Sequence, residues 1–600
     1  MSRDSSSNQR PPRSANLRRR LGVGGLSLVT TTGLFGTYLG YPGLRRAYAA
    51  PTCEVTTHYD SATLEPGELR YCLDQVDTPG GGTITIRPDI GTIYLNDDLP
   101  TVTAVGTFTI TGAGQGNSRI DGQNLSSAFR FSGLASTVYV SDLTIGNTYD
   151  ETYYAPAVDV VGDLTLSAFS AEGNESSDDG GAVRVGSNAV IRDSTFTNNE
   201  AARYGGALSI AGFAAVHDSD FDSNEAGEDG GAIAGYYTTT ITGSSFTSNS
   251  ALDDGGAVYV RLGNVNVTNS SFDSNDADYD SDGYGAGGAI WTSYGVDISD
   301  SVLNRNSAYD AGAIYSRSNA SITRSTFSYN TVSGFGGAIS GAPYPAPLAL
   351  LTVTNSTFTA NDAQGCAAIN WYGNAQVNFV TITANTSTGA NPNFPAIYVD
   401  GDVSLSNSIT FGNINVSGSS VDLDVRGVLT ASNSLLSSSS SFTALNGQTI
   451  SGVTYGDPKL GPLANNGGPV VANTGSPTLT MLPAANSPVI GMADPTGAPA
   501  FDQRGYTRTT NGYADMGSVE RGGRRPAPDP SQAPPAWFQA TTRNEETDPC
   551  PANMHPSWAQ WPNDNTGGWT CEWSTWWDIN KGNQGGWATT PGFNPGRPVS

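Results

Sequence analysis

Apolar and polar positions repeat about every 25 residues between Gly180 and Asn385. Each copy opens on two small residues, Ala and an aliphatic residue, and closes on an aliphatic residue, Ser, Phe and Asn at fixed spacing. A fixed period of this length is typical of stacked repeats, in which one copy cannot bury its apolar face alone. The opening phrases begin at Gly180, Gly205, Gly230, Gly255, Gly287, Ala311, Gly336 and Cys366. The closing phrases end in Phe196–Asn199, Phe221–Asn224, Phe246–Asn249, Phe272–Asn275, Leu303–Asn306, Phe327–Asn330 and Phe358–Asn361.

The composition of each copy predicts short strands and tight turns, because Ser, Thr, Asn, Asp and Gly favour turns and the apolar residues are β-branched or aromatic. Ser and Phe lie two apart and share one strand face, whereas the aliphatic residue five before Phe has the opposite parity, so a bend is predicted between them. We expect coils stacked roughly 4.8 Å apart. Phe then packs on Phe, and each Asn amide bonds the Asn of the next coil. The paired glycines are predicted where the backbone needs a positive φ or a close approach.

These two recurring phrases resemble the repeats of chlamydial polymorphic outer-membrane proteins and, more generally, the right-handed parallel β-helix. The resemblance implies an all-β fold, a solenoid over residues 83–455. Its coils are expected to be irregular over 83–179 and looser after Asn385. It says little about chemistry, because one fold hosts many functions.

The first 49 residues predict an export signal. Arg18-Arg19-Arg20 precede a mildly apolar run from Leu21 to Leu44, and Ala47-Tyr48-Ala49 forms an A-x-A-like cleavage site. The adjacent arginines resemble a twin-arginine signal. General export and an uncleaved anchor are the alternatives, and the glycines and Pro42 in the run disfavour the anchor. We expect no transmembrane span in the mature chain.

Residues 50–82 resemble the N-terminal cap of exported β-helix proteins. Leu69, Cys72, Leu73 and Val76 form one apolar face of a short predicted helix, ended by the glycines at 80–82. A cap is physically required, since the first coil otherwise leaves an open strand edge. In an oxidising compartment we expect a Cys53–Cys72 disulfide.

Residues 456–520 are similar, nearly phrase by phrase, to the tail of the choice-of-anchor Q proteins, in which a parallel β-helix is tied to the cell surface by varied devices. The resemblance implies a C-terminal cap on the last coil. Within the segment, Asp502, Arg504, Asp515 and Glu520 are expected to form a structural ion network rather than a catalytic centre.

Residues 521–545 predict a Pro-rich, extended linker, and residues 546–600 a separate Trp-rich module. A Cys550–Cys571 disulfide is expected to staple this small module, which leaves Cys366 unpaired. Its indoles have two open interpretations, a small buried core or exposed platforms for sugar rings. The candidate ligand-binding residues are Trp558, Trp561, Trp569, Trp573, Trp576 and Trp577.

The chain has a formal net charge of −26 and a pI of about 4.3, which argues against a nucleic-acid partner. Acidic residues recur in the turns before the glycine pairs. Stacked one coil apart, such carboxylates would repel, and calcium would relieve the repulsion. A solvated acidic face is the alternative, and no other cofactor is indicated. The candidate metal ligands are Asp179, Asp229, Asp254, Asp282 and Asp310.

Parallel β-helices include polysaccharide lyases and glycosidases, so an enzyme is a candidate. Asp178-Asp179 and Asp253-Asp254 are adjacent pairs, but neighbours in a strand point to opposite faces. An acid that recurs before each glycine pair is better explained as a turn former, so no catalytic residue is assigned. The sequence therefore favours an exported, adhesin-like protein that binds a cell-wall glycan, another extracellular glycan or a surface protein. A secreted polysaccharide-cleaving enzyme and a passive spacer remain the alternatives.

Overall fold

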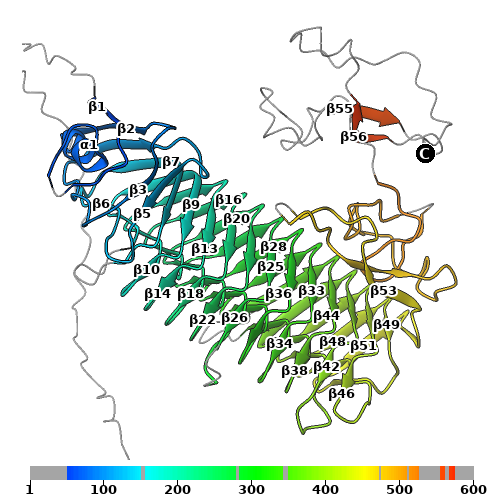
Figure 1. Cartoon of the computed structure of the whole chain (residues 1–600). Helices are drawn as coiled ribbons and strands as arrows, with labels where there is room; N and C mark the ends of the chain where they lie inside the picture. The colour runs from blue at the N-terminus through cyan, green and yellow to red at the C-terminus, as the bar shows by residue number, and fades with distance from the viewer. Residues whose placement is uncertain are drawn as a thin grey trace, which may run out of the picture. The chain divides into compact units, whose positions relative to one another are not determined.

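The computed structural model describes residues 50–525, apart from 62, 150–155, 279–282, 342–348, 472–473 and 510–511. Of the C-terminal residues it describes the backbone of 554–560 and 567–573. The chain forms a right-handed parallel β-solenoid of about 13 turns (Figure 1). The predicted all-β repeat fold is thereby confirmed. It is built of three parallel sheets, named A, B and C here: sheet A extends over residues 52–455, sheet B over 129–444 and sheet C over 175–415.

Each full coil passes through the three sheets in turn. In one coil, β15 (Leu208–Ile210) lies in sheet B, β16 (Ala214–His217) and β17 (Asp220–Asp222) lie in sheet A, and β18 (Glu225–Ala226) lies in sheet C. The predicted bend separates the two strands of sheet A, where Asp218 has a φ of 48°. The side chains that point inward from sheets A and B form one continuous core, and Ala277, Ala308, Val332 and Ala363 of sheet C form a separate small apolar cluster.

The remaining strands of sheets B and C follow the same register. Sheet B comprises β6 (Phe129–Phe131), β8 (Val158–Val160), β11 (Val183–Val185), β15, β19 (Ile233–Gly235), β23 (Val258–Val260), β27 (Ile290–Thr292), β31 (Ile314–Ser316), β35 (Ile339–Gly341), β39 (Ile369–Trp371), β43 (Ile397–Val399), β47 (Leu423–Val425) and β50 (Phe442–Ala444). Sheet C comprises β10 (Glu175–Ser176), β14 (Glu200–Ala201), β18, β22 (Ser250–Ala251), β26 (Asp276–Ala277), β30 (Ser307–Ala308), β34 (Thr331–Val332), β38 (Asp362–Ala363), β42 (Thr386–Ser387) and β46 (Ile414–Asn415).

Sheet A holds two strands per coil in the repeat region. Its first strands are β1 (Thr52–Val55), β2 (Gly80–Ile86), β3 (Gly91–Tyr94), β4 (Gly106–Thr111), β5 (Ser118–Asp121), β7 (Thr137–Gly146) and β9 (Asp163–Glu172). The paired strands are β12 (Ala189–Arg192) and β13 (Thr195–Thr197), β16 and β17, β20 (Thr239–Thr242) and β21 (Ser245–Thr247), β24 (Val265–Thr268) and β25 (Ser271–Asp273), β28 (Val296–Ser299) and β29 (Val302–Asn304), β32 (Ala320–Thr323) and β33 (Thr326–Ser328), β36 (Ala349–Thr354) and β37 (Thr357–Thr359), β40 (Gly373–Asn378) and β41 (Thr381–Thr383), β44 (Val403–Ser406) and β45 (Ile409–Phe411), β48 (Leu429–Ser432) and β49 (Leu435–Leu436), and β51 (Gln448–Ser451) and β52 (Thr454–Tyr455).

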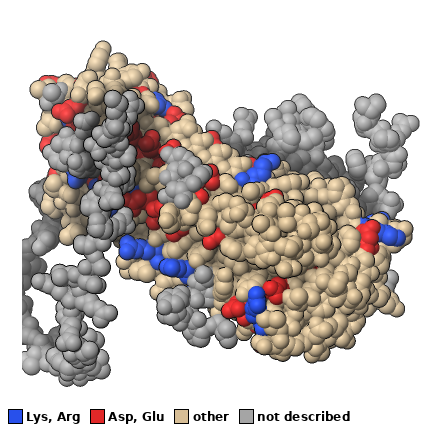
Figure 2. Space-filling model, turned by 90° about the horizontal axis from the view of Figure 1, so that it is seen from below, with Lys and Arg blue, Asp and Glu red and all other residues tan. Residues whose placement is uncertain are grey.

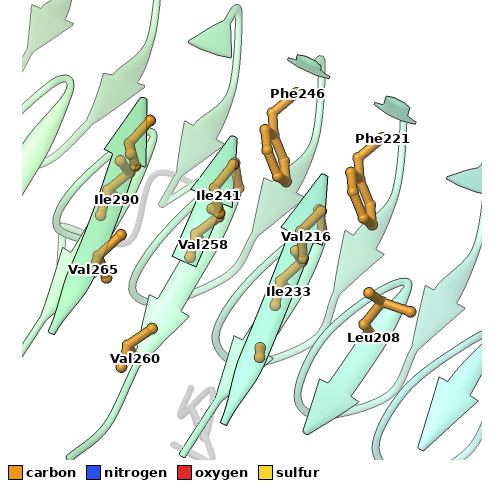
Figure 3. Packing of buried hydrophobic residues seen from close by; sticks show 14 of the residues in the cluster. Leu208, Val216, Phe221, Ile233, Ile241, Phe246, Val258, Val260, Val265 and Ile290 are labelled. Carbon is orange, nitrogen blue, oxygen red and sulfur yellow. The ribbon is translucent and has the colours of Figure 1, made fainter. Parts of the chain in front are cut away.

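Identical residues stack in the core as the spacing predicted. The ring centroids of Phe196 and Phe221 lie 4.8 Å apart, and those of Phe221 and Phe246 lie 4.7 Å apart with parallel planes. Figure 3 shows Phe221 and Phe246 in the same orientation, beside rows of aliphatic side chains from sheets A and B. Because each coil buries the same side chains against its neighbours, apolar burial is continuous along the axis.

A ladder of buried asparagines joins the coils on the side of sheet C. The Nδ2 group of Asn224 donates to Oδ1 of Asn249 at 2.8 Å, and Asn249 donates likewise to Asn275 at 2.9 Å. The same Asn249 amide also donates to the carbonyl of Phe221 at 3.0 Å. The predicted asparagine ladder is thereby confirmed. Because its bonds satisfy polar groups that are cut off from water, the ladder favours this one register of the coils.

The two glycines of each opening phrase serve different purposes. Gly230 has a φ of 72°, a left-handed conformation that glycine adopts without a steric penalty. At Gly231 an added Cβ would lie 2.1 Å from the carbonyl oxygen of Gly256 in the next coil. The first glycine therefore permits the turn and the second permits the coils to approach.

At the N-terminal end, helix α1 (Leu69–Val76) packs against β1 and β2. Leu69, Cys72, Leu73 and Val76 are buried, as the apolar face predicted. Cys72 forms the expected disulfide with Cys53. The helix has eight residues, and the described part of the chain contains no helix of the length and apolarity needed to cross a membrane.

The segment 456–525 contains the antiparallel pair β53 (Leu460–Ala464) and β54 (Thr480–Pro483) and folds back along the flank of sheet A. Gln503 Nε2 donates to Thr326 Oγ1 at 2.8 Å, and Thr357 Oγ1 donates to Gln503 Oε1 at 2.6 Å. An apolar patch of Phe379, Ile409 and Leu435 packs on Val489, Ala493, Ala514 and Met516.

This flank position differs from the expected cover over the last coil. Phe442, Ala444 and Ile450 in that coil are only partly buried. Thr326 and Thr357 of sheet A offer the segment hydrogen bonds, and Phe379, Ile409 and Leu435 offer it an apolar surface. The repeat pattern does not mark this flank of sheet A as a face that another segment covers. Of the expected ion network, one ion pair is present, between Arg504 and Asp502 at 2.8 Å. Glu520 and Asp515 join it through backbone groups: the Asp515 amide donates to Glu520 Oε2 at 2.8 Å, and the Glu520 amide donates to Asp502 Oδ2 at 2.9 Å.

Candidate binding surface

The middle residue of each sheet B strand points outward, because the two residues that flank it point into the core. Residues in this outward column lie one coil apart. Their order is Arg130, Asp159, Arg184, Ser209, Ala234, Tyr259, Trp291, Tyr315, Ser340, Asn370, Tyr398, Asp424 and Thr443. Unlike the inward columns, this one changes chemistry from coil to coil.

Three successive aromatic residues stack in the middle of the column. The ring centroids of Tyr259 and Trp291 lie 4.6 Å apart, and those of Trp291 and Tyr315 lie 6.3 Å apart. Trp291 lies between its two neighbours and is only 7% exposed. The guanidinium of Arg317 lies 5.7 Å from the Trp291 ring centroid. A cation is thus held against the middle ring of the stack.

A second cation lies against a ring one turn away. The guanidinium of Arg261 is 5.7 Å from the ring centroid of Tyr236, which is exposed. Tyr236 in turn contacts Tyr237, whose ring lies 5.6 Å from that of Phe213. We name the whole set the aromatic–arginine surface, formed by Tyr236, Tyr259, Arg261, Trp291, Tyr315 and Arg317.

Acidic turn residues border sheet B but are held by the backbone. Oδ1 of Asp229 accepts the amide of Asp254 at 3.0 Å, and Oδ1 of Asp254 accepts the amide of Ala286 at 3.0 Å. Oδ1 of Asp310 likewise accepts the amide of Phe335. Each carboxylate therefore pairs with an amide of the following coil, which is the turn-forming role that the sequence favoured.

The two consecutive carboxylates have strongly shifted acidities. Burial raises the pKa of Asp229 to about 6 despite the hydrogen bond from the Asp254 amide. Burial and the neighbouring Asp229 raise the pKa of Asp254 to about 8. A carboxyl that stays protonated near neutral pH adds little negative charge at this edge of sheet B.

The candidate calcium ligands do not form one continuous acidic column. Tyr204 occupies the position between Asp179 and Asp229, and Ala286 follows Asp254. Asp179 lies 3.7 Å from Arg203, and Asp282 lies outside the described residues. Among the described residues no group of three or more His, Cys, Asp or Glu side chains is arranged to hold a metal ion. Only Asp229 and Asp254 are consecutive among the four that the structure describes.

An alternating chain of ion pairs occupies the N-terminal part of sheet B. Asp159 lies 3.5 Å from Arg130 and 2.9 Å from Arg184, and Arg184 continues to Asp178 at 3.3 Å. Asp178 pairs with Arg203 at 2.9 Å. A shallow pocket of about 230 Å³ lies over Arg130, Asp159 and Arg184. Because these charges neutralise one another, the pocket carries no strong charge preference.

Sheet C presents the opposite chemistry on its outer side. Glu175, Glu200 and Glu225 lie one above another in register on β10, β14 and β18. Burial raises the pKa of Glu200, and the flanking Glu225 and Glu175 add to this effect. Figure 2 shows the solenoid from below, with acidic side chains gathered toward its N-terminal coils and few charges elsewhere on that face. This glutamate ladder therefore lies on a different sheet from the aromatic–arginine surface.

The Trp-rich segment is described only as an antiparallel backbone pair, β55 (Met554–Gln560) and β56 (Gly567–Trp573). In its register, Trp558 lies opposite Trp569, and Trp573 lies opposite Met554. Trp561, Trp576 and Trp577 lie outside the described residues, as does Cys550, so the expected Cys550–Cys571 disulfide stays a prediction. Cys366 is a buried free thiol, and burial raises its pKa.

The aromatic–arginine surface was not predicted from the sequence, although a signal for it exists. The residue between the two inward positions that follow each glycine pair must point outward once the strand is recognised. Reading that residue down the coils gives Tyr259, Trp291 and Tyr315 in succession. The inward positions repeat and therefore give a periodic signal, whereas the outward column varies and gives none.

Three stretches of the chain match the sequence profile of the Chlamydia polymorphic membrane protein repeat, at residues 193–211, 243–261 and 324–342. Each stretch begins at the bend of sheet A and ends with a strand of sheet B. The chain is therefore similar to these proteins in its repeats. A search of curated proteins found no match to this chain.

Proposed function

We propose that this protein is an exported, surface-displayed β-solenoid that binds an extracellular or cell-wall glycan without transforming it. The observation that carries the proposal is the aromatic–arginine surface, an outward feature that the core does not require. The likeness of the repeats to those of a chlamydial membrane protein and the Cys53–Cys72 disulfide support a location outside the cytoplasm.

Three further assignments belong to this proposal. Residues 50–82, with α1 over the first strands, act as the N-terminal cap, and residues 456–520 form a choice-of-anchor Q-like tail that strengthens the C-terminal coils. The Trp-rich residues 546–600, with Trp558, Trp561, Trp569, Trp573, Trp576 and Trp577, attach the solenoid to a wall glycan through the linker 521–545.

Retention of the full mature chain on purified cell wall and on a glycan array tests the proposal. We expect retention, and a loss of wall retention in the Trp576→Ala/Trp577→Ala double variant. The Tyr329→Ala variant, which changes an exposed aromatic residue elsewhere on the solenoid, is the matched control. Failure of the intact chain to bind any wall fraction or glycan would leave the passive spacer as the function.

Calcium binding at the acidic turns is proposed as a stabilising accessory. Titration calorimetry and thermal melting with excess calcium test it on the full chain. We expect heat of binding and a raised melting temperature that the Asp229→Asn variant diminishes. No heat and no shift would remove calcium from the proposal.

One observation favours an enzyme as the second candidate. Asp229 and Asp254 are neighbouring carboxyls with pKa values of about 6 and about 8, a separation of the kind that assigns a base and an acid. Their hydrogen bonds to backbone amides argue for the structural role. Release of reducing sugar from polysaccharides, abolished in Asp254→Asn, would establish the enzyme instead.

A further inference from the structure

The aromatic residues of the outward column are not needed to hold the coils together. The same column carries Ser209, Ala234 and Ser340 in neighbouring coils, whose strands pair in the same register. The half-buried Tyr259 and Tyr315 enclose Trp291, and the exposed rings of Tyr236 and Tyr237 lie beside this stack. Exposed aromatic groups that gather in one place mark interaction sites.

The shape of this surface suits an extended chain of rings. The stack of Tyr259, Trp291 and Tyr315 runs along the solenoid axis, since consecutive members belong to consecutive coils. Tyr236 and Tyr237 extend it by one coil and are 37% and 43% exposed. Tyrosine and tryptophan offer an apolar ring edge and a hydrogen-bonding group together, a combination that fits the C–H and hydroxyl groups of sugars.

The arginines of the surface set it apart from the rest of the solenoid. Arg184 and Arg203 on the same sheet side are paired with aspartates. Arg261 and Arg317 lie against aromatic rings. Neither forms an ion pair with a carboxylate among the described residues, and burial raises the pKa of Asp254 although the nearby Arg317 charge lowers it in part. In a chain of net charge −26, two such guanidinium groups favour a ligand that supplies the negative charge itself.

We propose that the aromatic–arginine surface binds an anionic polysaccharide laid along the solenoid axis, with its acidic groups on Arg261 and Arg317 and its sugar rings against the aromatic stack. This inference rests on the proposed glycan binding and adds its location and the charge class of the ligand. The glutamate ladder of sheet C lies on a different sheet, so it does not oppose the polymer at this surface.

Calorimetry on the full mature chain tests the site with three polymers: polygalacturonate, dextran sulfate and neutral dextran. Polygalacturonate and dextran sulfate separate carboxylate from sulfate as the source of charge, and binding of either anionic polymer supports the proposal. We expect the Arg261→Gln/Arg317→Gln double variant to weaken binding of the anionic polymer about tenfold or more. Tyr315→Ser, which places a residue already accepted in this column at Ser340, is expected to weaken it similarly.

The matched control is Arg305→Gln, which removes an exposed arginine paired with Asp273 elsewhere on the solenoid. It is expected to bind like the unchanged chain, and all variants are expected to keep their melting temperature within a few degrees. Equal binding of neutral dextran would overturn the charge class. Unchanged binding by both surface variants would overturn the site while the proposed glycan binding stands. Absence of binding to any polymer, together with no retention on cell wall or array, would overturn both.

Discussion

The inward and outward sides of the same coils follow different rules. The inward Phe221 and Phe246 are both 1% exposed or less and stack 4.7 Å apart with parallel rings. On the outward side of sheet B, Ala234 is followed by Tyr259 and then by Trp291. Both sides share one backbone register, yet only the inward one repeats.

The difference shows where each kind of constraint acts. An inward residue must fit the residue above and below it at close-packed density, so the same side chain recurs. An outward residue needs only to be compatible with a strand and with water. Residues in an outward column are therefore free to vary for the binding of a ligand. A residue that departs from the repeat in such a column can indicate a binding role.

Breaking the asparagine ladder is expected to have the largest effect. Asn249→Ala leaves the amide of Asn224, its Nδ2 group and the carbonyl of Phe221 without their partners in the core. The expected loss of unfolding free energy is about 3 kcal/mol or more, because several buried polar groups lose their hydrogen bonds together. Thermal melting and hydrogen exchange of the adjacent amides measure it. Ser250→Ala, on the outward side one residue away, is the control, and an equal loss there would contradict the contrast.

Phenylalanine removal tests the apolar part of the inward rule. Phe221→Ala is expected to cost about 3–5 kcal/mol, from lost burial and the cavity left in the stack. Phe221→Leu is expected to cost only about 1 kcal/mol, since the same ladder accepts Leu303 beside Phe272. Denaturant unfolding compares the two. Similar losses in both variants would mean that ring stacking, rather than filled volume, decides this column.

The contribution of the acidic turn residue Asp254 to stability is expected to depend on pH. The pKa of Asp254 is raised to about 8 in the folded protein, so folding favours its neutral form. The stability that neutral Asp254 contributes to the folded protein is fully present below a pH of about 4. This stability is lost as the pH rises toward about 8, the pKa of Asp254 in the folded protein. Asp254→Asn keeps an oxygen for the Ala286 amide and is expected to raise stability by roughly 2 kcal/mol at pH 8 and little at pH 4. Melting curves at both pH values check this, and a loss of stability at pH 8 would refute it.

Changes on the outward column are expected to have the smallest effect on stability. Tyr315→Ser should cost about 1 kcal/mol or less, because the half-buried ring stacks only loosely on Trp291, with ring centroids 6.3 Å apart, and Ser340 stands in the same column one coil on. Its melting temperature is compared with that of Phe221→Ala. A loss as large as for Phe221 would show that the aromatic stack is part of the core.

Much of the solenoid was predictable because its signal is periodic. The period, the bend before Ser219, the stacked Phe221 and the bonded Asn224 all followed from residue parity and spacing. The face of α1 and its disulfide followed from local patterning. The aromatic–arginine surface was missed, because nothing periodic marks Tyr259, Trp291 and Tyr315 as neighbours of Arg261 and Arg317.

The sequence by itself determined the coil, its inward ladders and its glycine turns, because these depend on contacts between residues one period apart. Only the tertiary structure decided where the segment after Gly456 lies, since Gln503 and Ser518 find their partners across 137 residues or more. It also decided how Arg508 is enclosed, where burial lowers its pKa to about 10. Contacts of that range follow no period, so no reading of spacing along the chain can supply them.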